Sequence, residues 1–109
     1  EGMRAGADGA VGSSYNFAAP LYLQMLAAES KGEFKKSESL QRLAVRMIEV
    51  VAKSGYLPMA KALMVRLGVD VGSVRLPLEP VSDAQTKHVV TQLIELGLHE
   101  GKHGWELAS

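Results

Sequence analysis

Residues 6–16 read GADGAVGSSYN, and the interpretation of the fold depends on this Gly-rich stretch. It has no helical periodicity. Ala10 and Val11 form a short apolar piece between Gly9 and Gly12, which is compatible with a buried strand that other backbone segments approach closely. The sequence therefore predicts one short strand here, at Ala10–Val11.

The chain after this stretch is predicted to be helical. Pro20 suits the first turn of a helix and Gly32 its end. The next helix, opening at Glu33 or Ser37, carries the clearest amphipathic pattern of the chain and ends at Gly55. The pattern further predicts a helix from Pro58 to Gly68 and an irregular connection over 69–80. A last helix is predicted to start in a Ser-x-x-Gln capping box at Ser82 and to end at Gly97.

A single strand cannot form a sheet, because its backbone donors and acceptors would remain unpaired. Two interpretations follow. Either residues 10–11 are a loop in a helical bundle, or the neighbouring strands lie outside these 109 residues. We favour the second, which predicts an α/β fold of which this chain is a mostly helical part.

The composition excludes several classes of protein. The 12 basic and 12 acidic residues cancel, which argues against nucleic acid or an anionic membrane as partner. The chain has no cysteine, so disulfides and thiolate metal sites are excluded, and it has no apolar run of about 18 residues that could span a bilayer. The first residues lack the pattern of a signal peptide, and we expect a cytoplasmic protein.

Residues 99–103 read HEGKH and match the H-E-x-x-H pattern of zinc proteases. That chemistry needs both imidazoles on one helical turn, and Gly101 argues against a helix here. We therefore expect no metal site, although a small zinc hydrolase remains an alternative. The glycines at 6, 9 and 12 match no dinucleotide or phosphate-loop motif, so no nucleotide cofactor is expected.

Polar side chains follow the predicted strand directly, at residues 13–16. In a (β/α)₈ barrel the loops after the strands form the active-site face, so Ser13 is positioned to bind a substrate. The alternative is an ordinary polar turn, in which a serine or asparagine caps the next helix.

Residues 6–16 resemble the G-A-D-G-x-[IV]-G-S-T-Y-N signature of the N-acetylneuraminate lyase branch of the dihydrodipicolinate synthase superfamily, with Ser14 in place of the usual threonine. Residues 31–34 with 40–41, 61–64 and 72–78 also resemble family segments. The resemblance implies a fragment of a TIM (β/α)₈ barrel. Residues 1–31 would be its last strand–loop–helix unit, 32–98 a C-terminal helical extension, and 99–109 a tail without an assigned role.

The resemblance also implies an activity: reversible aldol cleavage of N-acetylneuraminate to pyruvate and N-acetylmannosamine, through a Schiff base on a lysine and without a cofactor. Ser13 would contact the bound sugar acid, and Val11 and Gly12 would line the pocket. No catalytic residue is expected in this chain, because the Schiff-base lysine and the proton-transferring tyrosine belong to missing strands. The chain alone would be inactive, and the intact protein a homotetramer.

Two further functions stay open. The first is a different aldolase of the superfamily, which would be similar to dihydrodipicolinate synthase or would act on another 2-keto acid. The second belongs to another class: a non-enzymatic helical interaction domain whose amphipathic helices bury the surface of a partner.

Overall fold

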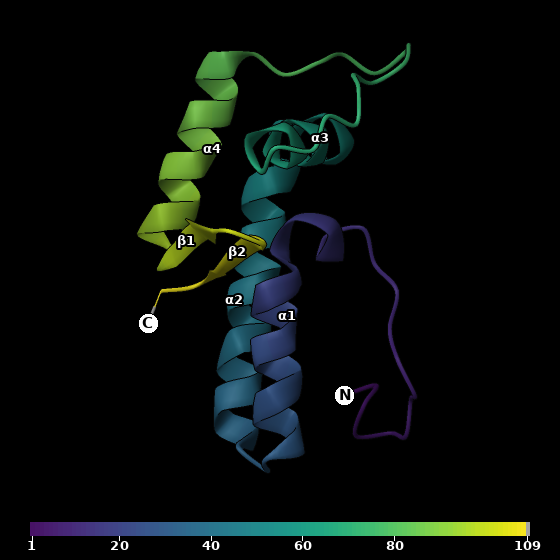
Figure 1. Ribbon diagram of the computed structural model, residues 1–109, viewed down its shortest axis with the longest axis vertical. Coiled ribbons are helices and arrows are strands. Elements are labelled where there is room, and N and C mark those ends of the chain that lie inside the picture. The colour runs from purple at the N-terminus through teal and green to yellow at the C-terminus, as the bar shows by residue number, and fades with distance from the viewer. Residues whose placement is uncertain (109) are drawn as a thin grey trace.

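The computed structural model describes residues 1–108. Within this range the chain forms four helices and one β-hairpin, shown in Figure 1. Their bounds are α1 Tyr15–Ser30, α2 Phe34–Ala52, α3 Tyr56–Arg66, α4 Asp83–Glu95, β1 Leu98–Gly101 and β2 Gly104–Leu107. None of the helices in this range is sufficiently long and apolar to cross a membrane.

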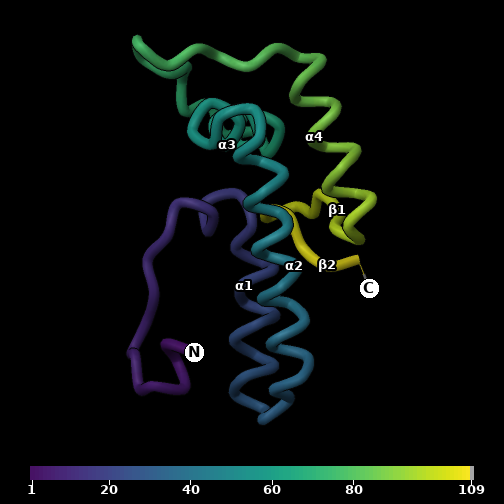
Figure 2. Tube along the Cα trace, turned by 180° about the vertical axis from the view of Figure 1, so that it is seen from behind, coloured from purple at the N-terminus to yellow at the C-terminus, as the bar shows by residue number. Residues whose placement is uncertain are grey.

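Helices α1 and α2 form a long antiparallel hairpin, and Figures 1 and 2 show them side by side from opposite directions. The chain reverses between them at Gly32, whose φ of +73° suits glycine. The apolar stripe predicted for the second helix faces this packing, since Leu40, Ala44 and Met47 are all at most 3% exposed. The amphipathic pattern of residues 34–52 was thus read correctly.

Helix α1 begins earlier than predicted, at Tyr15 instead of Pro20. The reason is a kink: Ala18 has φ −134° and ψ 29°, outside the helical range, and two helical segments meet there. Pro20 lies in the first turn after the kink, where a proline is tolerated because its missing N–H has no helical partner. The helix start predicted from Pro20 is therefore correct for the helical segment after the kink. The short helical segment before the kink was not predicted.

Helices α3 and α4 match their predicted places. Helix α3 crosses the end of α2 and begins two residues before Pro58, directly after Gly55, which has a φ of +90°. Residues 67–82 form the irregular connection that the glycines and prolines predicted. Leu63 of α3 and Leu93 of α4 are fully buried, and both join the core formed on α2.

The sequence predicted no structure for the tail beyond the absence of a helix. Residues 98–107 form an antiparallel hairpin, in which Glu100 pairs with Trp105 and Gly101 with Gly104. Trp105 is fully buried and belongs to the same core as the helices. Helical periodicity cannot detect a four-residue strand, and its glycines indicated only a broken helix.

Residues 10–11 form no strand in the described part of the chain. The segment before α1 instead runs as an irregular trace that returns toward the turn between α1 and α2 (Figure 1). A strand requires a neighbouring backbone for its hydrogen bonds, and residues 1–108 offer none at this place. The protein is consequently a mostly helical fragment, and the barrel itself is not visible.

The predicted capping box at the start of α4 is present and allows a first test. The Ser82 hydroxyl accepts a hydrogen bond from the Gln85 N–H at 3.1 Å, and the Gln85 side chain accepts one from the Ser82 N–H at 2.8 Å. We expect Ser82→Ala to lower the free energy of unfolding by about 1 kcal/mol, measured by urea denaturation. Ser82→Asp, which keeps a capping oxygen, should stay near the wild-type value.

Candidate functional site

The candidate site is the loop at residues 12–16, where the Gly-rich segment enters α1. The Ser13 hydroxyl donates a hydrogen bond of 2.9 Å to the Tyr56 hydroxyl at the start of α3. Ser13 remains exposed, so its oxygen is oriented by the protein and still accessible from outside. Because its single proton is donated to Tyr56, the Ser13 oxygen can accept a hydrogen bond from a ligand in a defined direction.

A second pair of hydroxyls lies beside the first. The Ser14 and Tyr22 hydroxyl oxygens are 2.8 Å apart, and Ser14 is only 7% exposed. The Tyr15 ring meets the Tyr22 ring edge-on, with centroids 4.4 Å apart. All three tyrosines of the chain thus gather around residues 13–15, two of them by hydrogen bonds to consecutive serines. Ser14 stands at the N-cap position of α1 but makes no capping bond, so the helix-capping interpretation was wrong for it.

Burial raises the pKa of the Tyr22 phenol above its ordinary value, and the hydrogen bond to Ser14 opposes this only in part. The neutral phenol is therefore the form that the fold accommodates. Above a pH of about 10, the unfolded chain ionises Tyr22 before the folded chain does, which favours unfolding.

We expect the free energy of unfolding contributed by Tyr22 to be complete below pH ~10 and to be lost as the pH rises from there through the higher folded-state pKa. Urea denaturation at several pH values between 8 and 12 measures it. In the Tyr22→Phe variant, the free energy of unfolding should fall less steeply with pH in this alkaline range. Equal slopes for both proteins would contradict the assignment.

The two pocket-lining candidates differ in their surroundings. A side chain at Gly12 would place its Cβ 3.2 Å from Cζ of the Tyr15 ring, so the absence of a side chain allows the ring to lie against the loop. Val11, in contrast, is fully exposed. The described chain therefore brings Gly12 and Ser13 to the tyrosines and leaves Val11 pointing away from the core.

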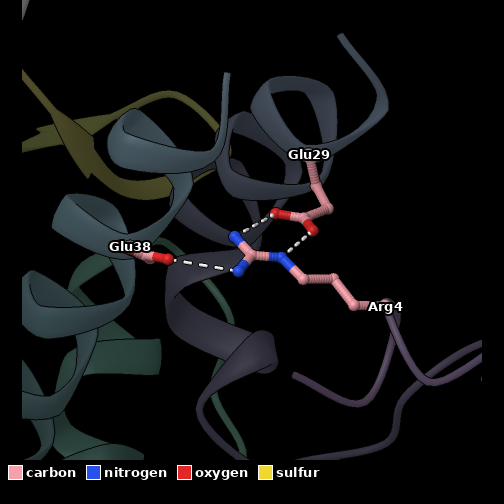
Figure 3. A network of polar contacts seen from close by, with 3 residues as sticks. All are labelled: Arg4, Glu29 and Glu38. Carbon is pink, nitrogen blue, oxygen red and sulfur yellow. Dashed lines mark hydrogen bonds and ion pairs between the residues drawn. The ribbon is translucent and has the colours of Figure 1, made fainter. Parts of the chain in front are cut away.

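Arg4, on the N-terminal side of the Gly-rich segment, binds residues of α1 and α2, as Figure 3 shows. The Arg4 guanidinium donates to both carboxylate oxygens of Glu29 on α1 and, at 3.1 Å, to Glu38 on α2. It also lies 4.6 Å from the centre of the Phe34 ring. The hydrogen bond from Arg4, supported by one from Ser37, holds the pKa of Glu29 below its ordinary value. Segment 5–12 is thus held at both ends.

The zinc-protease pattern at 99–103 lacks the geometry of a metal site. His99 lies on β1 and His103 in the hairpin turn, so no helical turn brings their imidazoles together. The His99 Nε2 atom is instead 3.1 Å from Oε1 of Glu106 on the opposite strand. Among residues 1–108 no three histidine or carboxylate side chains are grouped closely enough to bind a metal ion. The zinc-hydrolase alternative has no site in the described chain.

The sequence model of the Dihydrodipicolinate synthetase family matches residues 1–96. The chain belongs to this family. Its members are lyases of the class I aldolase type that bind keto-acid substrates. The match includes the whole candidate site and all four helices, and it stops before the hairpin.

Individual members of the dihydrodipicolinate synthetase family support the assignment. The chain is 35% identical over 83 residues to an N-acetylneuraminate lyase of Rhizobium meliloti (strain 1021), covering 76% of this chain and 28% of that protein. The structure superposes on the Proteus mirabilis N-acetylneuraminate lyase with a TM-score of 0.77 and 32% identity, covering 87% of this chain and 32% of that one. The Aliivibrio salmonicida N-acetylneuraminate lyase superposes with a TM-score of 0.76 and 31% identity, covering 86% of this chain and 31% of that one. The chain spans less than a third of the length of these relatives.

Two residues of the candidate site were missed by sequence reasoning, Tyr22 and Tyr56. Neither belongs to the signature at residues 6–16: Tyr22 is brought to it by the folding of α1, and Tyr56 by the packing of α3. The only available signal was that Tyr56 opens a helix directly after Gly55. Nothing in the spacing showed that this helix end would face Ser13.

Proposed function

We propose that this chain is the C-terminal part of a pyruvate-dependent Schiff-base aldolase that reversibly cleaves N-acetylneuraminate to pyruvate and N-acetylmannosamine. In this proposal residues 1–31 are the last strand–loop–helix unit of a (β/α)₈ barrel. Residues 32–98 are helices appended to the barrel, and the intact protein is a homotetramer. The single observation that carries the proposal is the exposed Ser13 hydroxyl, which Tyr56 orients at the end of the signature segment.

The proposed chemistry divides between this chain and the rest of the barrel. A lysine on another strand forms an imine with the keto carbon of the substrate, and the imine accepts the electron pair of the bond that breaks. In this chain, the Ser13 hydroxyl hydrogen-bonds the sugar acid, and Gly12 and Val11 line the pocket beside it. The full exposure of Val11 is compatible with a role against strands that residues 1–108 do not contain. No lysine of this chain is assigned the Schiff base.

The test is a chimera. In the Proteus mirabilis lyase, the segment that superposes on this chain is replaced by residues 1–109. Incubation with pyruvate and borohydride should trap a covalent adduct on a lysine outside the transplanted part, and the chimera should release pyruvate from N-acetylneuraminate. The isolated chain serves as the matched control and should give neither an adduct nor pyruvate.

The possible outcomes separate the alternatives. A folded chimera that forms no adduct overturns the aldolase proposal. A chimera that forms the adduct but cleaves only another 2-keto acid keeps the aldolase class and overturns the substrate. An adduct on one of the chain's own lysines would show that the assignment of the Schiff base to another strand is wrong.

A further inference from the structure

The C-terminal hairpin follows residues 1–96, which the family model matches. It is nevertheless built firmly into the fold. Trp105 is fully buried, and the backbone N–H of Leu107 donates to the Gln24 side chain of α1 at 3.2 Å. Glu100 of β1 accepts from Arg66 at the end of α3 at 2.7 Å. The hairpin thus joins three helices that belong to the family part of the chain.

The hairpin approaches α1 closely at the kink. A Cβ added to Gly104 would lie 2.7 Å from the Phe17 carbonyl oxygen and 3.1 Å from Cδ of Pro20. The φ of Gly104 is +130°, a conformation that side chains disfavour. Only a glycine permits this contact, so the hairpin backbone presses directly on the turn where Ala18 leaves the helical conformation.

The same turn leads to the candidate site. The Phe17 ring is fully buried, and its centroid is 6.4 Å from that of the Tyr56 ring. Tyr56 in turn accepts the hydrogen bond from Ser13. On the other side of the kink, the Ala18 N–H donates to the Ser14 carbonyl at 3.0 Å. Packed contacts therefore run without a gap from Gly104 through Phe17 to the Ser13–Tyr56 pair.

We propose that the hairpin is a positioning element, with Gly104 and Trp105 holding the kink of α1 so that the Ser13–Tyr56 hydrogen bond keeps its direction. This inference rests on the proposed function insofar as Ser13 is taken to contact the ligand. Gly104 and Trp105 touch no substrate in this proposal and act through Phe17 and Tyr56.

The test uses the 109-residue chain without substrate, so that its outcome is independent of the aldolase proposal. The ring NMR signals of Tyr56 and Tyr22 are compared in the wild type, Gly104→Ala and the control Lys102→Ala. Lys102 is an exposed residue of the turn in the same hairpin. We expect Gly104→Ala to shift the signals of both tyrosines by several linewidths and Lys102→Ala to leave them in place.

Internal controls distinguish positioning from general loss of structure. Signals from the far end of the α1–α2 hairpin, at Glu29 and Glu33, should stay unchanged in Gly104→Ala. Unmoved tyrosine signals in a folded Gly104→Ala protein, or equal shifts at both ends of α1, would overturn the proposal. Either result would leave the aldolase proposal intact, because that proposal is judged by the chimera.

Amide hydrogen exchange of the unmodified protein decides the question if Gly104→Ala does not fold. The Trp105 and Leu107 amides of the hairpin and the Ala18 amide at the kink should open with the same free energy as denaturant is added. If either group opens while the other stays protected, the loop and the hairpin are independent and the proposal fails.

Discussion

Replacing Trp105 by alanine is expected to lower the free energy of unfolding by about 3–5 kcal/mol, the range for removing a large aromatic side chain from a core. Trp105 is fully buried and joins the hairpin to the core of α1, α2 and α4. Because it is the only tryptophan of the chain, the measurement is urea denaturation followed by far-UV circular dichroism. A loss below ~1 kcal/mol would mean that the hairpin is not part of the core.

The matched control is Trp105→Phe. Among residues 1–108 the buried indole N–H of Trp105 has no hydrogen-bond partner, and leaving such a donor unpaired costs about 1–3 kcal/mol. Phenylalanine removes this unpaired donor and fills most of the space. The Phe variant is therefore expected to stay within about 1.5 kcal/mol of the wild type. If Trp105→Phe lowered the free energy of unfolding as much as Trp105→Ala, the shape of the indole would matter more than its apolar area.

The second large effect is expected on catalysis. In the chimera with the Proteus mirabilis lyase, Ser13→Ala should lower kcat/KM for N-acetylneuraminate about tenfold, because the loss of one hydrogen bond to the ligand costs about 1–1.5 kcal/mol. Steady-state kinetics measures it. The effect should lie mainly in KM if the bond is equally strong in the ground and transition states.

Two variants locate the origin of that effect. Ser13→Thr keeps the hydroxyl and should retain most of the activity. Tyr56→Phe removes only the acceptor that orients the Ser13 hydroxyl at 2.9 Å, so its loss should be smaller than that of Ser13→Ala. An unchanged kcat/KM for Ser13→Ala in a folded chimera would remove Ser13 from the substrate site.

The parts of the fold that could be predicted are those that local sequence controls. The stripe of residues 40–51 repeats every three or four positions, and it predicted α2 because burial of one face stabilises a helix regardless of its partner. The capping box at Ser82 was predictable because it satisfies backbone groups within four residues. The kink at Ala18 was not predicted, because Pro20 indicated the start of a helix and the short helical segment before it carries no pattern of its own.

The candidate site shows the same division. The signature at residues 6–16 selected Ser13, because the order of glycines and hydroxyls is a local property of the chain. Its partner Tyr56 lies 43 positions away, and Tyr22 meets Ser14 only after the helix has formed. No periodicity links residues 43 positions apart, and the kink at Ala18 interrupts the helical spacing between Ser14 and Tyr22.

By itself the sequence determined four helices, most of their ends and the family, since each of these is encoded in short segments of neighbouring residues. The tertiary structure alone decided the conformation of residues 98–107 and the surroundings of Ser13. The hairpin is too short to be recognised by pattern, and its stability comes from burying Trp105 against residues far away in the chain. What appeared as a chain end without a role is the segment that closes the core beside the candidate site.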